Sequence, residues 1–239
     1  MCNTKKYMKL LVITFMICLA SMNAKSEVCL YKGLVDYNCD GKLKIAITGD
    51  SVVYGTGDSE LGNRGGYPTR IRGLLPKGIK TVNLGFYSIR TVQLLGRFQS
   101  GIYDKALKNA DLVIIDLGRN DCLDGVPPNK TVRNLKRIVK YARTRESLND
   151  QKPPFVLVGT QIPCPSRRVC VGRINEAVIA SGKKGGLPVF FRFDRYPESV
   201  ISSDRIHPNS SGYQVIARKV SKFIKGRLQN ILMEEFTEN

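Results

Sequence analysis

One serine, one histidine and one aspartate are the residues of this chain whose types could do chemistry together. Ser51 closes a Gly49-Asp50-Ser51 triplet at the end of an apolar run, and His207 is the only histidine in the chain. A serine hydroxyl is a weak nucleophile at neutral pH unless a base takes its proton, and histidine has the pKa best suited to that task. Asp204 stands three residues before His207, where one turn of loop lets it orient the imidazole. The pattern predicts a serine nucleophile activated by histidine.

Two further positions could stabilise a negatively charged oxygen. Gly85 follows an apolar run, and a glycine lets its backbone N–H approach an oxyanion closely. Asn120 follows the next apolar run and could donate its side-chain amide to the same oxygen. Taken singly, Gly85 is a strand-ending glycine and Asn120 a turn residue. Their shared placement after apolar runs makes them candidates for one site.

Short apolar runs separate these residues and predict the strands that must position them. The runs are rich in Val, Ile and Phe without polar alternation, which is typical of strands buried on both faces. They span residues 44–48, 80–84, 112–117, 155–158 and 189–193. Amphipathic stretches between and after them predict helices, with apolar stripes over 132–142, 174–178 and 213–228. Segments 55–66 and 121–129, rich in Gly and Asp, predict loops.

Strands that alternate with helices predict an α/β protein with a five-stranded parallel sheet and right-handed crossovers. Ligand sites in such sheets lie at the carboxyl ends of the strands. Ser51 falls at one of these ends, and a helix is expected to begin beside it. The sequence shows no internal repeat and no low-complexity tract, so we expect a single domain over residues 25–239, with 25–43 as an N-terminal lead-in that could hold a disulfide loop.

The first residues have the pattern of an export signal. Lys5, Lys6 and Lys9 precede an uncharged apolar segment at 10–20. That segment is shorter than the roughly 20 residues of a membrane-spanning helix, so we expect a cleaved signal over residues 1–24 rather than a stable anchor. Cleavage after Ala20 and cleavage after Ala24 both stay open. The protein is therefore expected to be periplasmic or secreted.

The chain is strongly basic, with a formal net charge of +18. Loss of the three lysines of the signal would leave +15 (18 − 3). This charge favours anionic surroundings as a partner, although a basic surface that only keeps the protein soluble explains it equally well. No nucleic-acid motif accompanies the charge, so no nucleic-acid partner is expected. The oligomeric state stays open.

Five cysteines follow the predicted signal. An exported protein can keep disulfides, and the economical local pairs are Cys29 with Cys39 and Cys164 with Cys170, which leaves Cys122 over. Sequence alone does not fix this connectivity. None of the cysteine spacings is paired with histidine, so we expect no zinc site.

Residues 36–41 match the opening of a calcium-binding loop. The twelfth position of that loop should carry a glutamate with two ligand oxygens, but it is Ile47, inside the first predicted strand. We therefore expect a turn leading into the strand, with calcium as the less favoured alternative.

Four short motifs together resemble the SGNH/GDSL hydrolase family, over residues 44–225 or so. They are Gly49-Asp50-Ser51, Asn83-x-Gly85, Gly118-x-Asn120-Asp121 and Asp204-x-x-His207-Pro208. The resemblance implies a flavodoxin-like three-layer α/β/α sandwich and a Ser-His-Asp carboxylic ester hydrolase that needs no cofactor or metal. It makes Ser51 the nucleophile, His207 the general base and Asp204 its orienting partner. It also implies an oxyanion hole formed by the N–H groups of Ser51 and Gly85 and the amide of Asn120.

The substrate is less defined than the chemistry. Many relatives follow the glycine of the second motif with a small Ser-Gly pair, where this chain has Tyr87-Ser88, and this bulk leaves the acyl preference open. Small-molecule, lipid and carbohydrate esters all fit. Two alternatives remain: an acyltransferase with the same triad, and a non-catalytic basic protein that binds anionic lipid or glycan. The second is less favoured, because every triad position is filled.

Overall fold

A parallel β-sheet forms the centre of the computed structural model, which describes residues 28–144 and 152–237. The strand order is β4-β3-β5-β6-β7. Four strands have five or six residues and the edge strand β7 has three: β3 (Lys44–Gly49), β4 (Lys80–Gly85), β5 (Leu112–Asp116), β6 (Phe155–Gly159) and β7 (Val189–Phe191). The α/β class and the predicted strands are confirmed. The predicted signal at 1–24 lies outside the described residues.

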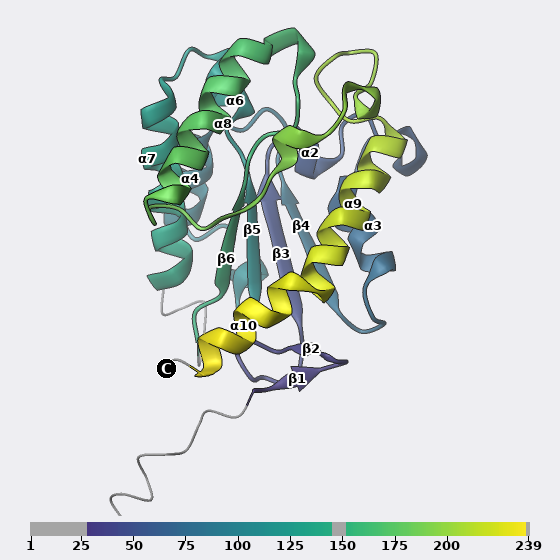
Figure 1. The fold of residues 1–239 in the computed structure, drawn as a ribbon, viewed down its shortest axis with the longest axis vertical. Helices are drawn as coiled ribbons and strands as arrows, with labels where there is room; N and C mark the ends of the chain where they lie inside the picture. Colours follow the sequence, from purple (N-terminus) through teal and green to yellow (C-terminus); the bar gives the residue numbers. More distant parts are fainter. Residues whose placement is uncertain (1–27, 145–151, 238–239) are drawn as a thin grey trace, which may run out of the picture.

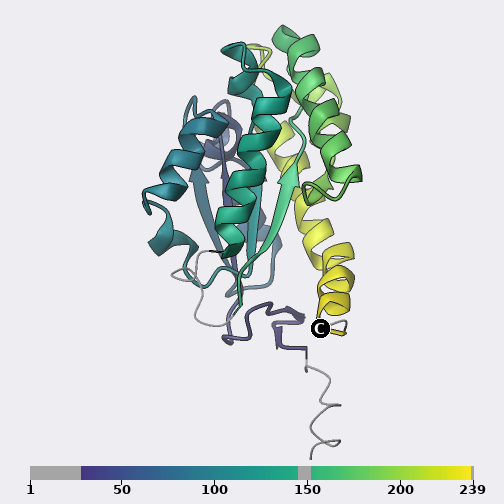
Figure 2. The ribbon, with the colours of Figure 1, turned by 90° about the vertical axis from the view of Figure 1, so that its left-hand side faces the viewer.

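Helices cover both faces of the sheet, as Figures 1 and 2 show. Alternate residues of one strand face opposite layers: Ile45 and Ile47 pack in the core beneath α3, α9 and α10, while Ala46 packs beneath α4, α7 and α8. The protein is therefore an α/β/α sandwich with two hydrophobic cores. The covering helices are α3 (Gly66–Leu74), α4 (Thr91–Gln99), α7 (Pro128–Thr144), α8 (Arg168–Lys183), α9 (Ser210–Lys225) and α10 (Arg227–Thr237).

Within residues 28–144 and 152–237, short helices occupy the connections. Three are single α-helical turns: α2 (Ser51–Tyr54), α5 (Asp104–Leu107) and α6 (Arg119–Leu123). Four are 3₁₀ turns, at Ser59–Leu61, Pro165–Arg167, Phe193–Arg195 and Glu198–Val200. The predicted helix beside Ser51 is confirmed as α2.

Several predicted boundaries were wrong. The apolar stripe over 213–228 belongs to two helices, because α9 ends before Gly226 and Leu228 lies in α10. Residues 121–123 lie in α6 and 128–129 begin α7, so the loop predicted at 121–129 is confined to 124–127. The last apolar run leaves the sheet after Phe191, and its final residue belongs to a 3₁₀ turn.

The N-terminal lead-in is an antiparallel pair, β1 (Leu30–Tyr31) and β2 (Leu34–Val35). The Cys29–Cys39 disulfide closes it, as predicted. The segment that resembles a calcium loop is a turn: the Asp36 carboxylate accepts the backbone N–H groups of Asp40 at 3.3 Å and Gly41 at 2.8 Å. These carboxylate oxygens are thus occupied by the turn itself.

The second disulfide differs from the local pair suggested by sequence. Cys122 of α6 bonds to Cys170 of α8, and Cys164 is left as a buried free thiol. The economical pairing of Cys164 with Cys170 is therefore wrong, because the fold places the β5 and β6 loops side by side although 48 residues separate the two cysteines. Within the described ranges, no helix is long and apolar enough to cross a membrane.

Candidate active site

The turn from β3 into α2 holds Ser51 at the carboxyl edge of the sheet. Asp50 is the N-cap of α2 and accepts the N–H of Val52 at 3.0 Å. A side chain at Gly49 could not fit, because its Cβ would lie 2.0 Å from the carbonyl oxygen of Asp116 on β5. The missing side chain lets the end of β3 pack closely against β5 and against Val53 of α2, and Ser51 there is 5% exposed.

His207 reaches Ser51 from the loop that precedes α9. Its Nε2 lies 2.8 Å from the Ser51 hydroxyl oxygen, and its Nδ1 lies 2.6 Å from Asp204 Oδ2. A bridge between Ile201 and Pro208 closes the base of this loop. An ionised carboxylate can only accept, so it selects the tautomer with hydrogen on Nδ1 and leaves Nε2 free to accept from the serine. The structure thus brings together the three residues predicted as a triad, although 153 positions separate Ser51 from Asp204 (204 − 51).

Asp204 is held as an anion by a set of hydrogen-bond donors. Burial alone would raise the pKa of this carboxyl, but the donors around it outweigh burial and hold the pKa well below its usual range. Its Oδ1 accepts the backbone N–H of His207 at 2.9 Å, the N–H of Ile206 at 2.8 Å and the hydroxyl of Ser202 at 2.7 Å. Sequence reasoning missed Ser202, which stands two residues before Asp204.

The two other residues predicted for the oxyanion hole lie at the same edge, each with a hydrogen bond already made. Gly85 pairs with Gly49 in the sheet, and its N–H donates to Asn83 Oδ1 at 2.8 Å. An oxyanion would have to compete with that bond. The Asn120 amide donates to Ile89 O at 2.9 Å, which leaves its second N–H hydrogen for another acceptor.

Asn83 is a positioning residue that sequence reasoning passed over, although it opens the second motif. Its amide donates to Val53 O at 2.9 Å and to Gly65 O at 3.0 Å. It therefore ties the end of β4 to α2 and to the loop before α3. The Gly85 Cα fits tightly there, since a Cβ would lie 2.2 Å from the Tyr54 nitrogen.

Charged side chains lie buried below the serine turn. Arg119, 1% exposed, places Nη1 3.5 Å from Asp50 Oδ1, while its Nε and Nη2 and Asp50 Oδ2 have no hydrogen-bond partner among the described residues. Asp116 accepts from Gln161 Nε2 at 3.2 Å and from the Tyr67 hydroxyl at 3.4 Å. Burial, with the nearby Asp50 charge, raises the pKa of Asp116 to about 7. The only indication of this cluster in the sequence was the charged Asp116 within the apolar run 112–117.

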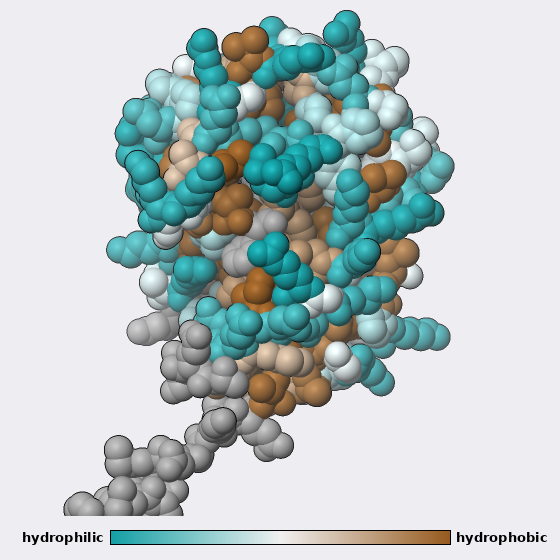
Figure 3. All heavy atoms as spheres, viewed as in Figure 1, coloured by the Kyte–Doolittle hydropathy of each residue, from teal (hydrophilic) through white to brown (hydrophobic). Residues whose placement is uncertain are grey.

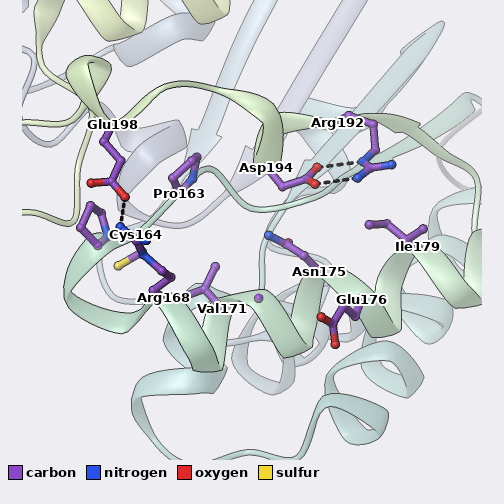
Figure 4. A pocket seen from close by; sticks show the side chains of 12 residues that line it. Pro163, Cys164, Arg168, Val171, Asn175, Glu176, Ile179, Arg192, Asp194 and Glu198 are labelled. Atoms are coloured by element: carbon purple, nitrogen blue, oxygen red, sulfur yellow. Dashed lines mark hydrogen bonds and ion pairs between the residues drawn. The ribbon is translucent and has the colours of Figure 1, made fainter.

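A pocket of about 340 Å³ lies beside the loop that carries His207, between α8 and the segment after β7. Figure 4 shows two ion pairs in its wall, Arg192 with Asp194 and Arg168 with Glu198. Cys164 lines the pocket and also contacts the loop that carries His207, because its sulfur lies 3.8 Å from the Arg205 carbonyl oxygen.

The family assignment rests on sequence as well as on this geometry. The family described as "GDSL-like Lipase/Acylhydrolase family" matches residues 47–215, from β3 into α9. The chain belongs to this family. The matched range includes Ser51, Asp204 and His207, so this GDSL-type chain is an ester hydrolase by family.

Solved structures with the same fold are distant in sequence. A lipase/acylhydrolase from Enterococcus faecalis is 21% identical, with 77% of this chain and 96% of that one covered and a TM-score of 0.58. An acetylxylan esterase from Geobacillus stearothermophilus is 20% identical, with 77% and 94% covered and a TM-score of 0.58. A member of the lipolytic protein G-D-S-L family from Veillonella parvula is 18% identical, with 74% and 96% covered and a TM-score of 0.57. At these identities the likeness shows the fold alone. Among the curated proteins, no match is found.

Proposed function

We propose that the protein is an exported serine esterase that hydrolyses carboxylic esters through an acyl-enzyme. The observation that carries this proposal is the relay from Ser51 through His207 to Asp204, with separations of 2.8 Å and 2.6 Å. Both lie within hydrogen-bond reach, which is the geometric requirement for a base and its orienting partner.

The reaction has two halves. Ser51 Oγ attacks the ester carbonyl while His207 Nε2 takes its proton, and the Asp204 carboxylate stabilises the imidazolium. The oxyanion accepts from the N–H groups of Ser51 and Gly85 and from the Asn120 amide. His207 then gives its proton to the leaving alcohol as the C–O bond breaks. Water, deprotonated by His207, hydrolyses the acyl-Ser51 ester and restores the free serine.

Export is supported by the cysteines. The described residues contain two disulfides, Cys29–Cys39 and Cys122–Cys170. Disulfides persist outside the reducing cytosol, which agrees with the export signal expected at residues 1–24. A periplasmic or secreted location follows from the proposal.

The first test is hydrolysis of p-nitrophenyl acetate, butyrate and octanoate by the chain without residues 1–24. Ser51→Ala should reduce turnover to background, because no other group supplies the nucleophile. Ser59→Ala is the matched control: its hydroxyl lies 3.2 Å from Ser210 Oγ rather than beside the histidine, and turnover should be unchanged. A fluorophosphonate probe should label Ser51, as found by peptide mass. Equal turnover in Ser51→Ala and the parent would reject the mechanism.

A further inference from the structure

Several large exposed apolar side chains lie in the segments that follow the carboxyl ends of the strands, the edge of the sheet that also holds the proposed nucleophile. We call four of them the apolar rim: Phe86, Tyr87, Leu123 and Val169, which are 45%, 58%, 43% and 69% exposed. Figure 3 shows that hydrophilic groups cover most of the face it draws, with smaller brown hydrophobic areas between them. Exposed apolar residues scattered singly need no explanation, but a continuous patch does.

The segments that carry the rim are bonded to one another, which holds its four residues on one side of the molecule. The loop after β4 meets α6 where Asn120 donates to Ile89 O at 2.9 Å and Thr91 N–H donates to Asp121 at 2.9 Å. The Cys122–Cys170 disulfide then joins α6 to α8, with the two Cα atoms 5.7 Å apart. Leu123 and Val169 are the sequence neighbours of these cysteines. The rim therefore lies on the segments that follow β4, β5 and β6, and β3, which leads into Ser51, lies between β4 and β5 in the sheet.

Positively charged side chains accompany the apolar rim. The guanidinium of Arg97 lies 3.7 Å from the centre of the Phe86 ring. Three exposed arginines, which we call the basic ring, lie on the same edge: Arg64, Arg167 and Arg205. Arg167 and Arg205 are close, because Ser166 N–H donates to Arg205 O at 3.3 Å.

Three acidic side chains at this edge already form ion pairs with neighbouring basic side chains. Asp124 pairs with Arg90, Glu198 pairs with Arg168, and Asp204 holds His207. The charge that the edge presents to a partner is therefore positive, in line with the +18 of the chain. Exposed apolar side chains beside cationic ones form a surface that is complementary to an anionic lipid bilayer.

We propose that the apolar rim and the basic ring dock this edge onto an anionic lipid surface. Phe86, Tyr87, Leu123 and Val169 enter the acyl-chain boundary, and the basic ring contacts the headgroups. An anionic polysaccharide would satisfy the arginines, but it would leave the aliphatic Leu123 and Val169 without a partner. The docked orientation turns Ser51 toward esters held in the lipid phase. This last step rests on the proposed function, whereas docking itself does not.

The absence of tryptophan from the chain provides a clean reporter. Phe86→Trp, made in a Ser51→Ala background to prevent hydrolysis, is titrated with vesicles of phosphatidylcholine alone and with added phosphatidylglycerol. We expect a blue shift and quenching by brominated acyl chains with the anionic vesicles, and binding at least tenfold weaker to the neutral ones. Adding Leu123→Ser with Val169→Ser should weaken binding about tenfold. The matched control pairs Leu30→Ser with Met233→Ser, two exposed apolar residues of β1 and α10, and should leave binding unchanged.

Outcomes separate this inference from the proposed function. If docking is right, the Leu123→Ser/Val169→Ser variant of the active chain hydrolyses soluble p-nitrophenyl acetate at the rate of the parent. Its rate of hydrolysis of an ester embedded in anionic vesicles falls about tenfold. Absence of vesicle binding by a chain that cleaves the soluble ester overturns docking alone. Vesicle binding by a chain without esterase activity overturns the esterase alone. Binding that falls with Arg167→Glu but not with the rim variant shows a purely electrostatic partner and also overturns the docking proposal.

Discussion

Two carboxylates near the carboxyl end of the sheet have opposite environments. Asp204 stands at the surface, with a side chain 43% exposed, and is surrounded by donors that hold its pKa low. Asp116 is buried at the end of β5, where burial and the Asp50 charge raise its pKa to about 7. The difference shows two balances of the same effects: burial outweighs the two hydrogen-bond donors at Asp116, whereas the donors around Asp204 outweigh its smaller burial.

The comparison also separates two roles. Asp204 accepts its hydrogen bonds from the loop that carries His207, so its negative charge stabilises the imidazole of that residue. Asp116 accepts from the buried Tyr67 and Gln161, and its neighbours Arg119 and Asp50 keep polar atoms without a partner among the described residues, so this cluster acts on the stability of the serine turn. Substitutions at Asp204 should therefore alter activity, and substitutions in the Asp116 and Arg119 cluster should alter the free energy of unfolding.

The largest effect is expected from Asp204→Asn. An amide cannot accept in the same way from His207 Nδ1–H, so the wrong tautomer is favoured and kcat should fall on the order of a thousandfold or more. The unfolding midpoint should move little, because the carboxylate is partly exposed. Ester hydrolysis measured beside a thermal melt checks this. A variant with parent-like kcat would remove Asp204 from the relay.

Asn120→Ala should lower kcat on the order of a hundredfold, the usual cost of losing one oxyanion donor. The amide also donates to Ile89 O, so a melt must accompany the kinetics. Asn134→Ala is a useful control, because Asn134 is a buried asparagine of α7 whose amide binds the Thr91 hydroxyl at 2.9 Å rather than the site. Unchanged kcat in Asn120→Ala would take Asn120 out of the oxyanion hole.

Arg119→Met should destabilise the fold by about 3 kcal/mol, because removal of one member of a buried charged pair leaves Asp50 uncompensated. Urea unfolding measures the change. Arg133→Met, on the exposed side of α7, provides the control and should change stability by less than about 0.5 kcal/mol. Equal effects of the two substitutions would mean that the buried cluster contributes nothing.

Asp116→Asn should change the pH dependence of stability. A carboxyl whose folded pKa is raised from 3.8 to about 7 binds more protons when folded, so its contribution to the unfolding free energy is lost as pH rises through that window. The Asn variant should show a weaker decline between pH 4 and 7. Some decline should persist, because burial also raises the pKa of Asp111 to about 7. A parent profile that is flat over this range would contradict the assignment.

Sequence predicted the fold because it depends on local patterns, and short motifs indicated which residues would meet at the carboxyl edge of the sheet. The apolar runs mark strands wherever they occur, and Asp204 and His207 interact within one loop. The buried partners of Arg119 could not be predicted, since nothing in the order of residues tells how deep a side chain lies. The break at Gly226 was missed for a related reason: the apolar stripe continues across it, and only the backbone changes direction.

The leftover thiol of Cys164 has a consequence for how the chain matures. The native partner of Cys170 is Cys122, 48 residues away, while Cys164 is only six residues away. Short loops close more readily than long ones in an unfolded chain, so early oxidation favours the non-native pair. Correct pairing therefore depends on the sheet forming first, or on a disulfide isomerase that reopens the wrong bond. A Cys164→Ser chain should reach its native disulfides faster under the same oxidant.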